Sequence, residues 1–250
     1  MKVPNDEPIL MRVADAIRSG RTVFPRNVSA PGVHHRTGNA TPILKRVEPH
    51  SGNKKMHGGV SRWTKGLFKG MPLYALTLEE RVTCPSDCHA WDICYGSRMP
   101  FATRFDVVED GGRCLMDQLE LELDALDSKW LAGYSLRLHV LGDFFSLEYV
   151  DFWQQQLAKR PLLHVFGYSH RSDGIGEAVA ALCEQYKGRW QILRSTPILG
   201  SHSQPVAMLE TDPGADKLPT CPEQTKRVTG CMTCGLCTLP WIRGVTFKIH

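Results

Sequence analysis

The sequence predicts an α/β protein, either a partial (β/α) barrel or a parallel sheet with outer helices, preceded by an irregular basic N-terminal arm. Short apolar runs alternate with amphipathic segments through the middle of the chain, and polar residues follow several of those runs. The N-terminal part is instead rich in Gly, Pro and basic residues. We therefore expect a basic arm over residues 1–70 and an α/β cluster-binding domain over 71–250 that includes the C-terminal cysteines.

The expected arm holds one short helix over residues 8–18, where Ile9, Val13 and Ile17 share a face. Residues 1–70 contain thirteen Lys/Arg and four Asp/Glu, a net charge of +9; since the whole chain is +4, residues 71–250 carry −5. A basic arm on a mildly acidic body suggests an anionic partner, with nucleic acid as the first candidate. The alternative is a solvated extension.

Within residues 20–70, the stretch 52–70 interleaves five basic residues with Trp63 and Phe68. Basic side chains that alternate with aromatic ones suit contacts with a nucleic-acid backbone together with base stacking. The alternative is a loop whose aromatic side chains simply pack against the body.

The body contains a regular series of expected strands and helices. A helix beginning at Gly112 carries a stripe of leucines, a second is capped by Ser146, and a third follows Arg171. The expected strands are 72–78, 135–141, 163–168, 190–193, 206–209 and 245–249. Such alternation builds a parallel sheet with helices outside it.

Polar residues gather directly after these strands. Gly142 and Asp143 follow the second strand, Arg171 lies just beyond the third, and Arg194 comes near the end of the fourth. In parallel sheets and barrels, ligands bind at the carboxyl edge of the strands. We therefore expect these residues to converge on one site with the cysteine loop that follows the first strand.

Seven of the nine cysteines fall into two short segments, one after the first strand and one near the C-terminus. Thiolates are soft ligands for zinc or iron–sulfur clusters, and short spacings let one ion or cluster reach several of them. The chain is therefore expected to bind metal, and a disulfide framework is the alternative. The expected ligands are Cys84, Cys88 and Cys94 in the first group and Cys221, Cys231, Cys234 and Cys237 in the second.

The spacing favours iron–sulfur over zinc. The second group contains CxxCxxC, which is the ligand run of bacterial ferredoxins, and Cys221-Pro222 supplies a fourth thiolate. The first group offers three thiolates, which would leave one iron of a four-iron cluster open to a ligand. We expect one or two [4Fe–4S] clusters, with zinc as the alternative; the two groups could also share one site. Cys114 and Cys183 are expected to be small apolar side chains.

No apolar run approaches the roughly 20 residues that a membrane span requires, and the N-terminus lacks the apolar core of a secretory signal. We therefore expect a cytoplasmic protein without a membrane partner, in a compartment that keeps thiols reduced. An electron donor would be a partner if the cluster is redox-active.

The cysteine motifs resemble a family of phage and plasmid proteins of the mycobacteriophage gene-product type. The shared segments are Cys84-Pro85 with Cys94-Tyr95, the run from Gly142 to Ser146, the run from Tyr168 to Arg171, the cysteines of 221–237, and Phe247 to His250. The resemblance covers about residues 52–250 and implies a phage-related protein, with no particular activity.

A looser resemblance is to radical S-adenosylmethionine enzymes, which have a three-cysteine loop after the first strand of a partial barrel. This resemblance implies an open iron that binds S-adenosylmethionine. It further implies that Gly142 and Asp143 hold the methionine amine, that Arg171 or Arg194 pairs with its carboxylate, and that the C-terminal cysteines hold an auxiliary cluster.

Two main hypotheses of function follow. The first is an iron–sulfur enzyme of radical S-adenosylmethionine type, acting on an unknown and nucleic-acid-related substrate. The second is a non-enzymatic nucleic-acid-binding protein with structural zinc or iron–sulfur sites. A redox sensor, whose cluster state changes partner binding, is the third.

Overall fold

A computed structural model describes residues 42–50, 53–80, 82–91, 93–94, 96, 104–105, 107, 111–200 and 204–249. Most of the predicted basic arm, including the expected helix over residues 8–18, lies outside these ranges, as do Tyr95 and His250. No helix in the described part of the chain combines the length and the apolar character needed to cross a membrane.

The core of the fold is one seven-stranded sheet with the strands in chain order, β1-β2-β3-β4-β5-β6-β7. The first pairing, β1 with β2, is antiparallel, and every later pairing is parallel. This arrangement confirms the predicted α/β class with a parallel sheet. The strands are β1 (Lys45–Arg46), β2 (Leu73–Ala75), β3 (Tyr134–Leu138), β4 (Leu163–Ser169), β5 (Trp190–Ser195), β6 (Val206–Leu209) and β7 (Gly244–Phe247).

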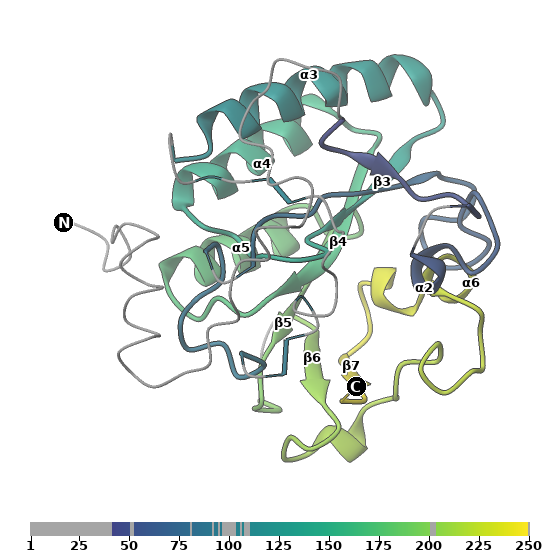
Figure 1. The fold of residues 1–250 in the computed structure, drawn as a ribbon, viewed down its shortest axis with the longest axis vertical. Helices are drawn as coiled ribbons and strands as arrows, with labels where there is room; N and C mark the ends of the chain where they lie inside the picture. The colour runs from purple at the N-terminus through teal and green to yellow at the C-terminus, as the bar shows by residue number, and fades with distance from the viewer. Residues whose placement is uncertain are drawn as a thin grey trace.

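Three long helices connect the central strands, as the apolar periodicity predicts. Their bounds are α3 (Arg113–Lys129), α4 (Leu147–Lys159) and α5 (Gly174–Gln185). The Ser146 hydroxyl accepts from the backbone N–H of Tyr149 and so caps α4, as expected, and Asp173 caps α5 in the same way. These helices gather on one side of the sheet (Figure 1).

The other side of the sheet is covered by segments from the two ends of the described chain. The short helix α2 (Lys54–His57) and the cysteine helix α6 (Cys231–Cys234) lie there side by side (Figure 1). Two 3₁₀ turns, η2 (Ala215–Lys217) and η3 (Leu236–Thr238), complete the C-terminal segment. The long helices therefore cover one face of the sheet, and short helices and turns cover the other.

Strand alternation separates the two faces. In β2, Tyr74 belongs to the large core beneath the helices, whereas Leu73 and Ala75 belong to a second core that contains Phe166 of β4. A third small core joins Leu193 of β5 to the C-terminal segment. The C-terminal cysteines pack on this face, since Cys231 and Cys237 lie against the second core and Cys221 belongs to the third.

The structure decides between the two interpretations of the aromatic side chains in residues 53–70. Trp63 and Phe68 are 2% and 0% exposed, and they pack edge-on against each other at 5.7 Å within the second core. The Trp63 indole N–H also donates to the Ser135 hydroxyl of β3 at 2.8 Å. The two rings therefore pack on the body, which was the alternative to base stacking, and this part of the predicted arm is integral to the fold.

Candidate functional site

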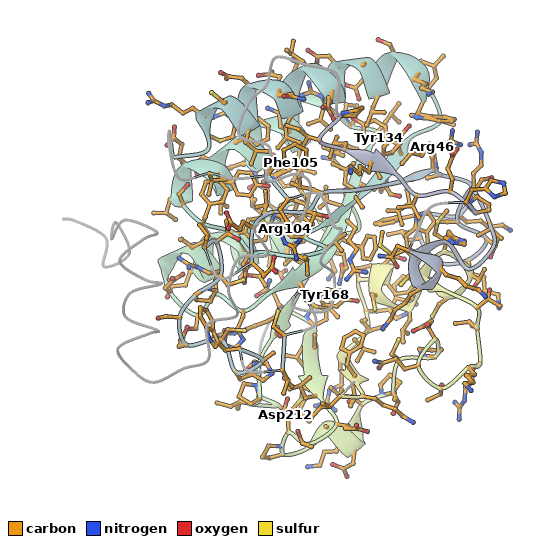
Figure 2. All side chains as sticks on the ribbon, viewed as in Figure 1. Arg46, Arg104, Phe105, Tyr134, Tyr168 and Asp212 are labelled. Atoms are coloured by element: carbon orange, nitrogen blue, oxygen red, sulfur yellow. The ribbon has the colours of Figure 1, made fainter. Side chains whose placement is uncertain are left out.

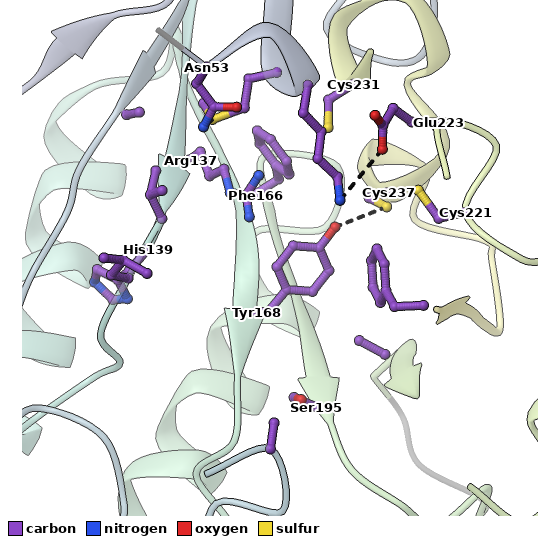
Figure 3. Close-up of a pocket in the computed structure, with 18 of the residues that line it drawn as sticks. Asn53, Arg137, His139, Phe166, Tyr168, Ser195, Cys221, Glu223, Cys231 and Cys237 are labelled. Carbon is purple, nitrogen blue, oxygen red and sulfur yellow. Dashed lines mark hydrogen bonds and ion pairs between the residues drawn. The ribbon is translucent and has the colours of Figure 1, made fainter. Parts of the chain in front are cut away.

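A cavity of about 930 Å³ lies against the sheet face opposite the long helices. Arg137 of β3, Phe166 and Tyr168 of β4 and Ser195 of β5 form its floor, and the C-terminal cysteine segment forms a wall (Figure 3). All seven cysteines of the two groups line it, namely Cys84, Cys88, Cys94, Cys221, Cys231, Cys234 and Cys237. The two cysteine groups therefore face one cavity, an arrangement that the sequence analysis left open.

The C-terminal cysteine group contains two glycines at positions where a side chain would collide with neighbouring backbone. Gly230 precedes α6 and Gly235 follows it, the latter in the left-handed region at φ +74°. A Cβ at Gly235 would lie 2.6 Å from the Cα of Gly66, and one at Gly230 would lie 2.6 Å from the backbone N of Gly58. The cysteine segment therefore docks directly on the backbone of residues 58–66.

Hydrogen bonds fix this docking. The Thr229 hydroxyl donates to the Gly58 carbonyl at 2.8 Å, and the Thr64 N–H donates to the Met232 carbonyl at 2.9 Å. Cys221 is anchored separately, since its N–H donates to the Thr246 carbonyl of β7 at 2.8 Å. The four cysteines are thus held by β7 on one side and by the 58–66 segment on the other.

The thiols of this group are reduced and lie in an environment that disfavours bare thiolates. Burial raises the pKa of Cys237 to about 12; the hydrogen bond from the Tyr168 hydroxyl, 3.2 Å away, works against that rise, and the three other cysteines add to it. Burial also raises the pKa values of Cys231 and Cys234, while Arg137 lowers that of Cys231. The four sulfurs therefore lie within electrostatic reach of one another, and ionising them together requires added positive charge.

The first cysteine group lies in the loop between β2 and α3 and is tied to the loops after β3 and β4. The Thr83 hydroxyl accepts from the N–H of Asp143 at 3.1 Å and donates to the Glu79 carbonyl at 2.9 Å. The His89 N–H donates to Nε2 of His170 at 3.2 Å, and the two Nδ1 atoms lie 3.0 Å apart. These contacts hold the loop at the carboxyl edge of the sheet.

His89 is a site residue that the sequence analysis did not single out. It lines the cavity beside Cys88, and its Nε2 lies 3.7 Å from the Asp212 carboxylate. Burial and His170 lower the pKa of His89, and Asp212 raises it in part. Its place between two cysteines of one loop was the available signal, because it travels with that loop to the cavity.

A second clamp on the loop is the Glu80–Arg104 ion pair. Arg104 Nε lies 2.6 Å from Glu80 Oε2, and its Nη2 donates to the Gly96 carbonyl at 3.0 Å. Glu80 itself lines the cavity. This bidentate pair joins the two ends of the loop that carries Cys84, Cys88 and Cys94.

Gly142 and Asp143 line the cavity as predicted, and their contacts are structural. Oδ1 of Asp143 accepts from the N–H of Phe144 and from the Ser169 hydroxyl, both at 2.7 Å, and Oδ2 accepts from the N–H of His170 at 2.8 Å. Burial raises the pKa of Asp143, and these hydrogen bonds work against that rise. The carboxylate therefore joins the loops that follow β3 and β4.

The two arginines predicted to pair with a cofactor carboxylate lie elsewhere. Arg171 is 2% exposed and its Nη2 lies 2.8 Å from Asp173, the cap of α5. Neither Arg171 nor Arg194 lines the cavity, whereas Arg137 does. Arg137 could have been noticed as a charged residue at an alternating position within a buried strand.

Within the described ranges, no three His, Cys, Asp or Glu side chains form a group arranged to hold a metal ion. All seven cysteines of the two groups line the same cavity, and thiolates are soft ligands that both zinc and iron–sulfur clusters accept.

Comparison of the chain with protein-family models, with curated proteins and with solved structures finds no match.

Proposed function

We propose that this protein is an iron–sulfur protein whose two cysteine groups bind clusters in one cavity. The observation that carries the proposal is that seven cysteines from two distant segments line the same cavity, which lies against one face of the sheet. Burial favours the protonated form of these thiols, and a bound metal centre would supply the positive charge that stabilises them as thiolates.

The C-terminal group would hold a four-iron cluster through Cys221, Cys231, Cys234 and Cys237. The tight turn at Gly235 brings three of these cysteines into one short helical segment, and β7 brings the fourth. Lys55 and Arg137 also line the cavity and offset the negative charge that four thiolates would bring. This group supplies a complete ligand set, which is typical of an electron-carrying or structural cluster.

The first group would hold a second cluster through Cys84, Cys88 and Cys94, with one iron open to a ligand. Its loop follows the first parallel strand and contacts the loop of Gly142 and Asp143, which is the order expected of a radical S-adenosylmethionine-type enzyme. A bound cluster of this type supplies the electron that cleaves S-adenosylmethionine. Among the chain's own residues, Arg46 and Arg137 carry guanidinium groups that line the cavity, and a guanidinium suits a carboxylate.

The second candidate function is non-enzymatic binding of nucleic acid, and the observation that favours it is the charge of the cavity lining. Lys45, Arg46, Lys55, Arg137 and Lys248 line the cavity, against three acidic residues. Each of those acids has a partner: Glu80 pairs with Arg104, Asp143 accepts from loop N–H groups, and Glu223 lies 3.5 Å from Lys55. An anionic ligand, including a nucleic-acid substrate of the enzyme, would therefore be attracted to it.

Anaerobic reconstitution followed by electron-spin resonance tests the first function. The reduced protein should give a cluster signal that S-adenosylmethionine alters, and the alteration should vanish in Cys84→Ala/Cys88→Ala/Cys94→Ala. An unaltered signal from an intact cluster would exclude the S-adenosylmethionine role and leave the cluster itself in place. If S-adenosylmethionine does alter the signal, an electron donor is a required partner of the enzyme.

Filter binding at increasing salt tests the second function. Nucleic-acid binding through cationic side chains should weaken steeply as salt rises. The matched comparison is with a chain that lacks residues 1–41, because a longer deletion would remove core side chains, namely Ile43, Leu44, Val47, Met56, Trp63 and Phe68. Equal binding by both chains would place the contact on the body instead of the arm.

A further inference from the structure

The side chain of Tyr168 links the sheet to a cysteine of the C-terminal group. Tyr168 lies on β4, where strand alternation points it away from the long helices and into the cavity beside Phe166 (Figure 3). Its hydroxyl lies 3.2 Å from Sγ of Cys237 and donates to it. A phenol is a donor of fixed direction once its ring is held, so the position of the ring decides the strength of this contact.

Two neighbours hold the Tyr168 ring. Phe247 of β7 packs edge-on against it, with centroids 5.5 Å apart and planes at 86°. On β3, which pairs with β4, the Arg137 guanidinium lies 5.5 Å from the centroid of the Tyr168 ring. The ring is thus fixed between β3 and β7, and Arg137 brings a positive charge to the same place.

A phenol is un-ionised at neutral pH, so the Tyr168 hydroxyl is a neutral donor. Away from bulk water, an O–H that points at a sulfur is worth more than it would be in water.

Hydrogen bonds to ligand sulfurs and nearby charge set the reduction potential of an iron–sulfur cluster. Reduction adds negative charge that is shared with the sulfurs, so a donor or a cation beside them stabilises the reduced state more than the oxidised one. We propose, resting on the proposed iron–sulfur function, that Tyr168 and Arg137 are positioning residues that raise the reduction potential of the C-terminal cluster. They make this cluster easier to reduce than one with the same ligands and no donor.

The test compares Tyr168→Phe with Tyr134→Phe in the full chain. Tyr134 is the control, because it is a buried tyrosine whose hydroxyl also donates, to Asp127 at 2.8 Å. It lies in the core beneath the helices and apart from Tyr168 (Figure 2). Both variants carry Cys84→Ala/Cys88→Ala/Cys94→Ala, so that any remaining cluster belongs to the C-terminal group.

Iron and acid-labile sulfide are measured first, and the midpoint potential is then measured by anaerobic redox titration of the cluster absorbance. We expect Tyr168→Phe to shift the potential to more negative values with the iron content unchanged, while Tyr134→Phe leaves it in place. Arg137→Gln should shift it in the same direction. The shift of the Arg137→Gln/Tyr168→Phe double variant should differ from the sum of the single shifts, because the two side chains are in contact.

Each outcome has a distinct meaning. A cluster with an unchanged potential in Tyr168→Phe would overturn the tuning role and leave the iron–sulfur function intact. Loss of the cluster from Tyr168→Phe, with thermal unfolding unchanged, would also overturn it and show that the hydroxyl is needed for assembly. If the parent chain holds no iron or sulfide, the proposed function itself fails.

Discussion

Replacing Asp143 by Asn tests whether this carboxylate holds the loops of the site together. Its two oxygens accept three hydrogen bonds, from the N–H of Phe144, the hydroxyl of Ser169 and the N–H of His170. Asn can keep the two bonds to one oxygen. The amide NH₂ would then face the N–H of His170, and two buried donors would oppose each other.

The expected cost follows from these contacts. A buried N–H without an acceptor costs about 1–3 kcal/mol, and the other two bonds lose the strength that a charged acceptor gives them. Part of this loss is offset, because the carboxylate is buried and burial raises the pKa of Asp143. We expect a net decrease of about 2 kcal/mol in the free energy of unfolding.

Urea unfolding of the reduced, metal-free protein measures the effect. Asp151→Asn is the control, since Asp151 is exposed on α4 and its substitution should change the free energy of unfolding by less than about 0.5 kcal/mol. A value for Asp143→Asn within the same range would refute the structural role. If S-adenosylmethionine binding were then lost, Asp143 would instead be a cofactor ligand.

Three further predictions concern stability and metal content. Burial lowers the pKa of His139 to about 3, below its unfolded value of 6.5, so its contribution to stability is present above pH 6.5 and is lost as pH falls. Between pH 6.5 and 4.5 this loss should reach about 2.7 kcal/mol. In His139→Gln, the free energy of unfolding measured with urea should therefore fall less over this pH range than it does in the parent chain. Gly235→Ala should lower the melting temperature more than Gly70→Ala, because both positions have positive φ but only the Cβ at 235 meets backbone, the Cα of Gly66 at 2.6 Å. Equal shifts would indicate that the close approach is relieved at no cost. Cys183→Ala should leave the iron content of reconstituted protein unchanged, because its thiol lies beneath the helices and does not line the cavity; a fall in iron would make it a ligand.

The parts of the fold that could be predicted are those with a clear period. The leucine stripe of α3 and the cap at Ser146 located two helices within a residue or two, and the strands after them followed from apolar runs bounded by turns. Strand β1 has only two residues, which is too short to show an alternating apolar pattern. The four-residue helix α6 also could not be predicted, because its glycine neighbours and close docking depend on partners distant in sequence.

The site was predictable in outline because parallel strands bring their carboxyl ends to one edge. That rule placed the loop of Cys84 beside Asp143, as observed. It could not distinguish Arg171, which pairs with Asp173, from Arg137, which faces the cavity. Which charged side chain points inward depends on strand alternation and on local capping, and both act at the level of single residues.

The most direct measurement is the content of iron, zinc and acid-labile sulfide per chain in anaerobically purified and reconstituted protein. If two clusters are bound, the protein should be brown and contain about eight irons and as many sulfides per chain. Both numbers should fall to about four when either cysteine group is replaced by alanine. Zinc bound in proportion to protein without sulfide, or no metal at all, would contradict an iron–sulfur protein.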